Sequence, residues 1–178
     1  MANEGQLAYS YDRPAGLPGL VIGVNDHDRV RALLAVAADP GLVVRVQVGT
    51  NTDPPTVELP LDDTGVFYGV IEYDPTKQGS DPQGSAPLYA AGDVVTVVRR
   101  GRIWCRSDGR GAPNQFDDAR VVTTNGAGNQ GQVTGATVAA NLVKDLGSNA
   151  LVYYTPRTAA IVGGTASDTI EAVEINFP

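Results

Sequence analysis

The sequence has very few of the residues that build disulfides, zinc sites and catalytic triads. Among its 178 residues, Cys105 is the only cysteine and His27 the only histidine. One cysteine cannot form an internal disulfide, and a structural zinc site needs about four Cys or His ligands. Folding therefore does not depend on an oxidising compartment, and we expect no metal site, no cofactor and no catalytic centre.

Positive charge and long apolar runs are also scarce. The chain carries 13 Lys and Arg against 20 Asp and Glu, a net charge of -7. Binding to a phosphate backbone depends on clustered cations that release counterions, so we expect no nucleic-acid partner. No apolar run approaches the roughly 18 residues of a membrane-spanning helix, and the first residues lack the basic and apolar pattern of a signal peptide. We therefore expect no membrane partner, and assembly in a cytoplasm.

Glycine and proline, by contrast, are abundant, with 21 and 12 residues. They separate short stretches with the pattern of strands: Val44, Val46 and Val48 alternate with polar residues, as in a strand with one buried face. Further stretches rich in β-formers are residues 57–61, 66–73, 94–99, 102–106, 119–123, 133–139, 158–162 and 169–177. We expect a mainly β fold, an antiparallel β-sandwich or β-barrel, with at most one or two short helices.

Residues 26–38 are compatible with two structures. Apolar residues recur there at the i, i+3, i+4, i+7 spacing of a helix face, with Pro40 and Gly41 placed to end a helix. A buried strand through residues 33–37 fits the same sequence. The pattern leaves the choice open, and His27 would lie at the start of the helix.

A β-hairpin is predicted around Arg100 and Gly101. These two residues separate the β-rich stretches 94–99 and 102–106, and a short turn that contains glycine between two strands is typical of a hairpin. The densest cluster of cations in the chain lies here, and we expect it to be a solvated hairpin tip: Arg99, Arg100, Arg102 and Arg106.

The first residues differ in composition from the rest, so we divide the chain into an extended N-terminal arm, residues 1–24, and a single β-rich domain, residues 25–178. Residues 12–19 contain two prolines and two glycines, which favour extended or turning backbone. The arm could lie on a partner or on its own domain. Contacts with a partner are predicted at Tyr9, Tyr11, Arg13 and Leu17, with the proline- and glycine-rich loop of residues 74–87, around Asp81, as a second contact.

Two motifs resemble catalytic or cofactor-binding sequences. Residues 126–131 match G-x-G-x-x-G, but a dinucleotide site needs a helix to begin at that loop, and the residues that follow predict a strand. Asp63-Thr64-Gly65 is the triplet of aspartic proteases, in which two such aspartates share a proton. With one triplet per chain, a protease would have to be a homodimer. Asp-Asp-Thr-Gly between strands is also an ordinary turn composition, and we keep the protease as an alternative.

Four segments resemble a known family. They are residues 89–97 (Tyr-Ala-Ala-Gly-Asp-Val-Val-Thr-Val), residues 101–104 (Gly-Arg-Ile-Trp), residues 172–178 (Ala-Val-Glu-Ile-Asn-Phe-Pro) and the extended segment 14–21 (Pro-Ala-Gly-Leu-Pro-Gly-Leu-Val). Together they resemble the head decoration proteins of tailed bacteriophages, also called structural cement proteins. The long loop of residues 74–87 and the acidic residues 62–65 depart from the family pattern.

The resemblance implies a function that needs no reaction. Proteins of this family are β-rich, commonly oligomeric and often trimeric, and they lie on the outside of the capsid where major capsid protein subunits meet. The expected protein is therefore a virion structural protein that cements those subunits, with the major capsid protein and its own copies, in a homotrimer, as partners. Another virion part, such as a tail or fibre-base module, is the remaining alternative.

Overall fold

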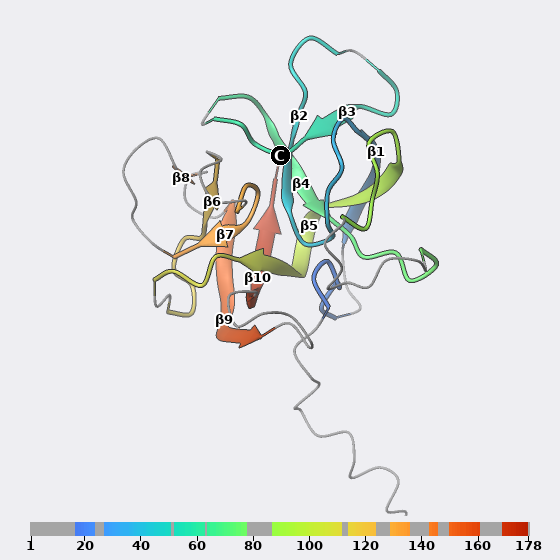
Figure 1. Ribbon diagram of the computed structural model, residues 1–178. Coiled ribbons are helices and arrows are strands. Elements are labelled where there is room, and N and C mark those ends of the chain that lie inside the picture. Colours follow the sequence, from blue (N-terminus) through green and yellow to red (C-terminus); the bar gives the residue numbers. More distant parts are fainter. Residues whose placement is uncertain are drawn as a thin grey trace, which may run out of the picture.

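The structure is a computed structural model, and it is built entirely from strands and loops in the part of the chain that it describes (Figure 1). The described residues are 17–23, 27–50, 52–62, 64–77, 87–111, 114–123, 129–135, 143–145, 150–160 and 169–177. The strands are β1 (Asp28–Leu34), β2 (Val43–Val46), β3 (Thr56–Glu58), β4 (Phe67–Ile71), β5 (Val94–Ser107), β6 (Arg120–Val122), β7 (Val133–Thr134), β8 (Val143–Asp145), β9 (Leu151–Ala160) and β10 (Thr169–Asn176). The mainly β prediction is confirmed, and no helix occurs in these ranges.

Five strands close into a small barrel. They are paired in the order β1-β3-β2-β4-β5, and β5 pairs back with β1. Closure removes the free strand edges along which chains aggregate. The interior is filled by small and aliphatic side chains with one tyrosine, namely Ala32, Leu34, Ala38, Leu42, Val44, Val57, Ile71, Tyr89, Val95 and Val97.

The long strand β5 is shared with a second group of strands. Its first half belongs to the barrel, and its second half pairs with β10 and with β7. Strand β10 pairs with β9, β7 pairs with β6, and β6 pairs with β8. This group encloses a core of its own that includes Ile103, Cys105, Val121, Tyr153 and Val173. Strand β5 contributes side chains to both cores, and it connects the two groups of strands (Figure 1).

The barrel wall contributes to both cores through the alternation of side chains along its strands. Val43, Val70 and Val98 are register partners on β2, β4 and β5 and pack into the second core. Their sequence neighbours Val44, Ile71 and Val97 pack inside the barrel. Consecutive apolar residues are expected where both faces of a strand are buried, which explains the adjacent Val97 and Val98 in the sequence.

The helix considered for residues 26–38 is wrong: residues 28–34 form strand β1, which begins and ends earlier than the buried strand considered for residues 33–37. β1 pairs on one side with β3 and on the other with β5, and this tertiary pairing overrides the helical spacing of its apolar residues. His27 precedes this strand and starts no helix.

The predicted hairpin at Arg100-Gly101 is also wrong. β5 runs through both residues without a turn, pairing Arg100 with Asn176 and Gly101 with Ile175. Gly101 has a φ of 124°, a backbone conformation that glycine adopts readily. The imidazole of His27 occupies the space beside it, because a Cβ added there would lie 2.2 Å from His27 Cδ2. The glycine therefore allows close packing inside a continuous strand.

Candidate functional site

The residues predicted to contact a partner are described only in part. Tyr9, Tyr11, Arg13 and Asp81 lie outside the described residues. Leu17 is described and is 36% exposed. These contacts therefore stay predictions, and the surface has to be examined from the residues that the structure places.

Residues 17–23 lie along β5 as part of the body. The amide of Gly19 donates to the carbonyl oxygen of Trp104 at 2.7 Å, and the amide of Trp104 donates to the carbonyl oxygen of Leu20 at 3.0 Å. The amide of Ile22 donates to the carbonyl oxygen of Arg102 at 2.8 Å, and Val21 forms a bridge with Ile103. These bonds cover the edge of β5 between its pairings with β1 and β7, so this part of the predicted arm contributes to the sheet.

Gly19 is fixed by a close approach of three segments. Its φ is 79°, and a Cβ added there would lie 2.7 Å from the amide nitrogen of Tyr73 and 2.8 Å from the Cβ of Pro40. No other residue fits this position without moving backbone. The N-terminal segment is thereby held in one place on the body.

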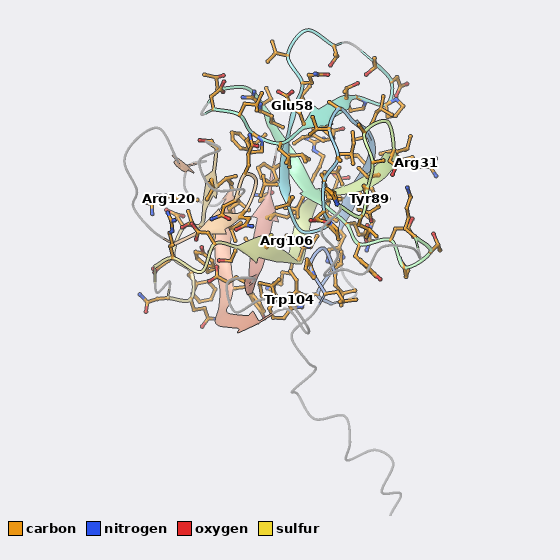
Figure 2. The ribbon with its side chains drawn as sticks, in the orientation of Figure 1. Arg31, Glu58, Tyr89, Trp104, Arg106 and Arg120 are labelled. Atoms are coloured by element: carbon orange, nitrogen blue, oxygen red, sulfur yellow. The ribbon has the colours of Figure 1, made fainter. Side chains whose placement is uncertain are left out.

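The loop that contains the Asp-Thr-Gly triplet is fastened by a buried arginine. Arg45 on β2 is 4% exposed. Its Nη2 lies 2.9 Å from Glu58 Oε1, and its Nη1 lies 2.5 Å from Asp62 Oδ1 and donates to the carbonyl oxygen of Thr64 at 2.8 Å. Glu58 and Trp104 lie at opposite sides of the view in Figure 2, so this loop is remote from the N-terminal segment. Leu61 and Val66 are exposed at its two ends.

Asp62 is held in its charged form. The Thr64 hydroxyl and amide donate to its carboxylate, and with Arg45 they lower the pKa of Asp62 from 3.8 to about 2. Hydrogen bonds and an adjacent cation favour a carboxylate in this way. Asp63, the residue that a protease would use, lies outside the described residues. The described contacts of the loop are those of a structural clamp.

A cleft opens where the N-terminal segment, β5, β9 and β10 meet. Its volume is about 640 Å³, within the range of roughly 300–1,000 Å³ typical of binding pockets. We call it the Phe116 cleft, and its lining residues are Ile22, Gly23, His27, Arg100, Gly101, Arg102, Phe116, Val152, Tyr153, Tyr154, Glu174, Ile175 and Asn176.

One wall of the Phe116 cleft is an ordered group of charged and aromatic side chains. The Arg102 guanidinium lies 3.7 Å from the centre of the Tyr154 ring, a cation–π contact. Its Nε also donates to Glu174 Oε2 at 3.0 Å. Arg102 is thus held by two partners before anything binds, although exposed pairs of this kind add little to stability.

Phe116 is the most unusual residue of the cleft. It is 69% exposed, and it is the only non-glycine residue with positive φ, 70°, among the described residues. Its amide donates to the carbonyl oxygen of Tyr153 at 2.8 Å, which fixes the backbone beside β9. A bulky residue in this conformation is strained, and strain of this kind is often found at functional sites.

Nothing in the described residues resembles a catalytic or metal centre. Cys105 is fully buried, and burial, with Glu171 nearby, raises the pKa of its thiol, so it is not an activated nucleophile. No group of three His, Cys, Asp or Glu side chains that could hold a metal occurs in the described ranges, and no stretch within them forms a membrane-spanning helix.

Sequence reasoning did not identify the Phe116 cleft. Phe116 lies in a loop with no periodic pattern, and a phenylalanine in the sequence does not indicate a positive φ. Arg100 and Arg102 were noted as a basic cluster but assigned to a hairpin tip. The one available signal was the concentration of arginine on one segment of an acidic chain.

Comparisons with known proteins agree with the resemblance in the sequence. The chain matches the family model described as "Structural cement protein (E217 gp24/Pam3 gp6)" over residues 6–170. A chain in the solved structure "The capsid of Myoviridae Phage XM1" shares its fold with a TM-score of 0.62 and 15% sequence identity, and the alignment covers 95% of each chain. No curated protein matches.

Proposed function

Because the chain belongs to the structural cement protein family, we propose that it decorates the outside of a phage capsid and holds neighbouring major capsid protein subunits together. The observation that carries this proposal is the family match, which extends from residue 6 to residue 170. It spans β1 to β9, the start of β10 and most of the N-terminal region, so it concerns nearly the whole body and not a single motif.

The architecture supports a mechanical role. The barrel is closed, β5 runs through both cores, and residues 19–22 cover part of its remaining edge. Close-packed cores have low compressibility and transmit strain. A body of this kind can connect neighbouring subunits without deforming under a load that pushes them apart.

Charge supports an external position. The chain has a net charge of -7, so its surface repels the phosphate backbone of packaged DNA. On the outer surface of the capsid, this charge faces solvent. The protein then becomes part of the virion, with assembly taking place in the host cytoplasm.

Several copies are proposed to act together as a homotrimer. Linked binding sites increase overall affinity without new contacts, because the second and third sites bind at a high effective concentration. Each copy would contribute an arm, residues 1–16, with Tyr9, Tyr11 and Arg13, and a second contact near Asp81, while Leu17 lies at the root of the arm. The protein performs no reaction in this role.

Add-back of the purified protein to heads assembled without it tests the proposal. We expect saturable binding to the outer surface and a higher temperature or force for head rupture. Absence of binding to heads, or binding without any gain in their resistance to rupture, would contradict it. Peptide cleavage that depends on Asp63 would instead support the protease alternative.

A further inference from the structure

We propose that the Phe116 cleft binds an extended segment of the major capsid protein in which an acidic residue neighbours an apolar one. This inference rests on the proposed function and names the surface and the chemistry of the contact. It is carried by three observations: a strained and exposed aromatic residue, an exposed arginine that lines the same cleft, and a wall that is ordered in advance.

The position of Phe116 is not explained by folding. Phe116 is 69% exposed, so it contributes little to the core, and its φ of 70° costs free energy that glycine or asparagine would avoid. An exposed aromatic ring in a concave surface is instead typical of a residue that anchors a partner. Burial of this ring on binding would supply the apolar part of the contact.

The charge of the cleft selects an acidic partner. Arg100 is exposed and has no ion pair within the described part of the chain. Arg102 also lines the cleft, and its partner Glu174 is the only acidic residue among the described residues that line it. An excess of cations in one cleft of a chain with a net charge of -7 favours a local acidic group.

Binding here depends on side chains, because the neighbouring strand edges are occupied. Val152 and Tyr153 of β9 pair with β10 on one side. On the other side, the amides of Phe116 and Tyr153 donate to the carbonyl oxygens of Tyr153 and Asp117. A peptide cannot add a strand at this point of β9. The segment must therefore fit the cleft through an apolar residue against Phe116 and a carboxylate near Arg100.

Two substitutions with matched controls test the cleft. Phe116→Asn removes the ring and keeps a residue type that tolerates positive φ, and Val48→Asn removes a 76% exposed apolar side chain that does not line the cleft. Arg100→Gln removes one cation, and Arg31→Gln makes the same change in net charge on exposed β1 residue Arg31. Binding is measured on purified heads assembled without the protein, at low and high salt.

We expect Phe116→Asn to weaken head binding about tenfold or more, without lowering the melting temperature, because asparagine tolerates the positive φ. Arg100→Gln should weaken binding mainly at low salt, since salt screens exposed charges. Val48→Asn and Arg31→Gln should bind like the unchanged protein. If the unchanged protein does not bind heads, the proposed function fails. If it binds, and both cleft variants bind equally well, only the inference about the cleft is overturned.

Photocrosslinking identifies the occupant. With p-benzoylphenylalanine placed at position 116, irradiation of decorated heads followed by mass spectrometry should yield crosslinks to a segment of the major capsid protein that contains Asp or Glu. Crosslinks to a second copy of this chain, or to a capsid segment without acidic residues, would overturn the inference. Absence of a crosslink on heads that bind the protein would do the same.

Discussion

The guanidinium of Arg45 and the carboxylate of Asp62 meet at 2.5 Å between Nη1 and Oδ1, and this contact fastens the loop after β3 to the barrel wall. Arg45 simultaneously binds Glu58, whose side chain is 12% exposed. A buried arginine with two carboxylates and a carbonyl oxygen around it satisfies most of its donors. The loop that resembles a catalytic triplet is thus explained by the stability of the barrel.

Replacement of Arg45 by alanine should destabilise the protein strongly. It leaves Glu58 charged and buried without a partner, and removal of one member of a buried pair costs about 3–5 kcal/mol. Chemical denaturation measures the change in the free energy of unfolding. Arg31→Ala, on the exposed face of β1, is the control and should change it by less than about 0.5 kcal/mol. Equal effects of the two substitutions would show that the clamp has no structural role.

Asp62→Asn should lower stability in a pH-dependent way. The pKa of Asp62 is about 2 in the folded protein and 3.8 ordinarily, so its charged form stabilises the fold at pH values above about 4. This stabilisation is lost as the pH falls from about 4 towards 2. Melting temperatures of the two proteins should therefore differ at neutral pH and converge near pH 2. A difference that stays constant over this range would contradict the assignment.

Two truncations should distinguish the contribution of residues 1–16 to capsid binding from the contribution of residues 17–20 to stability. Removal of residues 1–16 leaves the hydrogen bonds of Gly19, Leu20 and Ile22 with β5 in place, so the melting temperature should not change while head occupancy falls. Removal of residues 1–20 also deletes Gly19 and Leu20 and exposes the β5 edge, so it should lower the melting temperature. Full occupancy after removal of residues 1–16 would exclude the arm from capsid binding.

Gly19→Ala should be more damaging than its small size suggests. Its Cβ would lie 2.7 Å from the backbone nitrogen of Tyr73, and the φ of 79° is unfavourable for alanine. We expect the free energy of unfolding to fall by more than the roughly 1–2 kcal/mol that the left-handed φ alone costs, because backbone must also move, and denaturation measures this loss. Gly49→Ala provides a control, because its φ of 86° is similar but nothing lies within 4 Å of the added Cβ. Equal losses of stability in the two variants would mean that the cost comes from φ alone and that the close contact of Gly19 with Tyr73 has no effect.

The sequence predicts the class of this fold well because its signal is local. Valine alternation and stretches rich in β-branched residues predicted strands near β2, β4 and β10, and many short strands separated by turns predicted a sandwich or a barrel. Closure of the barrel depends on the pairing of β1 with β5, two segments far apart in the sequence. The same long-range pairing decides residues 28–34, where the local pattern was compatible with a helix.

The predicted hairpin failed for a related reason. Glycine is common in turns, but Gly101 lies inside β5, where the absence of a Cβ leaves room for the ring of His27. Only the contact across the fold distinguishes the two uses of glycine. The Phe116 cleft was likewise beyond the sequence, because it forms where four separate segments converge and its aromatic anchor lies in a loop without a pattern.

Cryo-electron microscopy of heads reconstituted with this protein tests the central claim most directly. The account predicts density for the two-core body on the outer capsid surface, in contact with more than one major capsid protein subunit. Density confined to the tail, to the inner surface or to the interior of a single capsid subunit would contradict it.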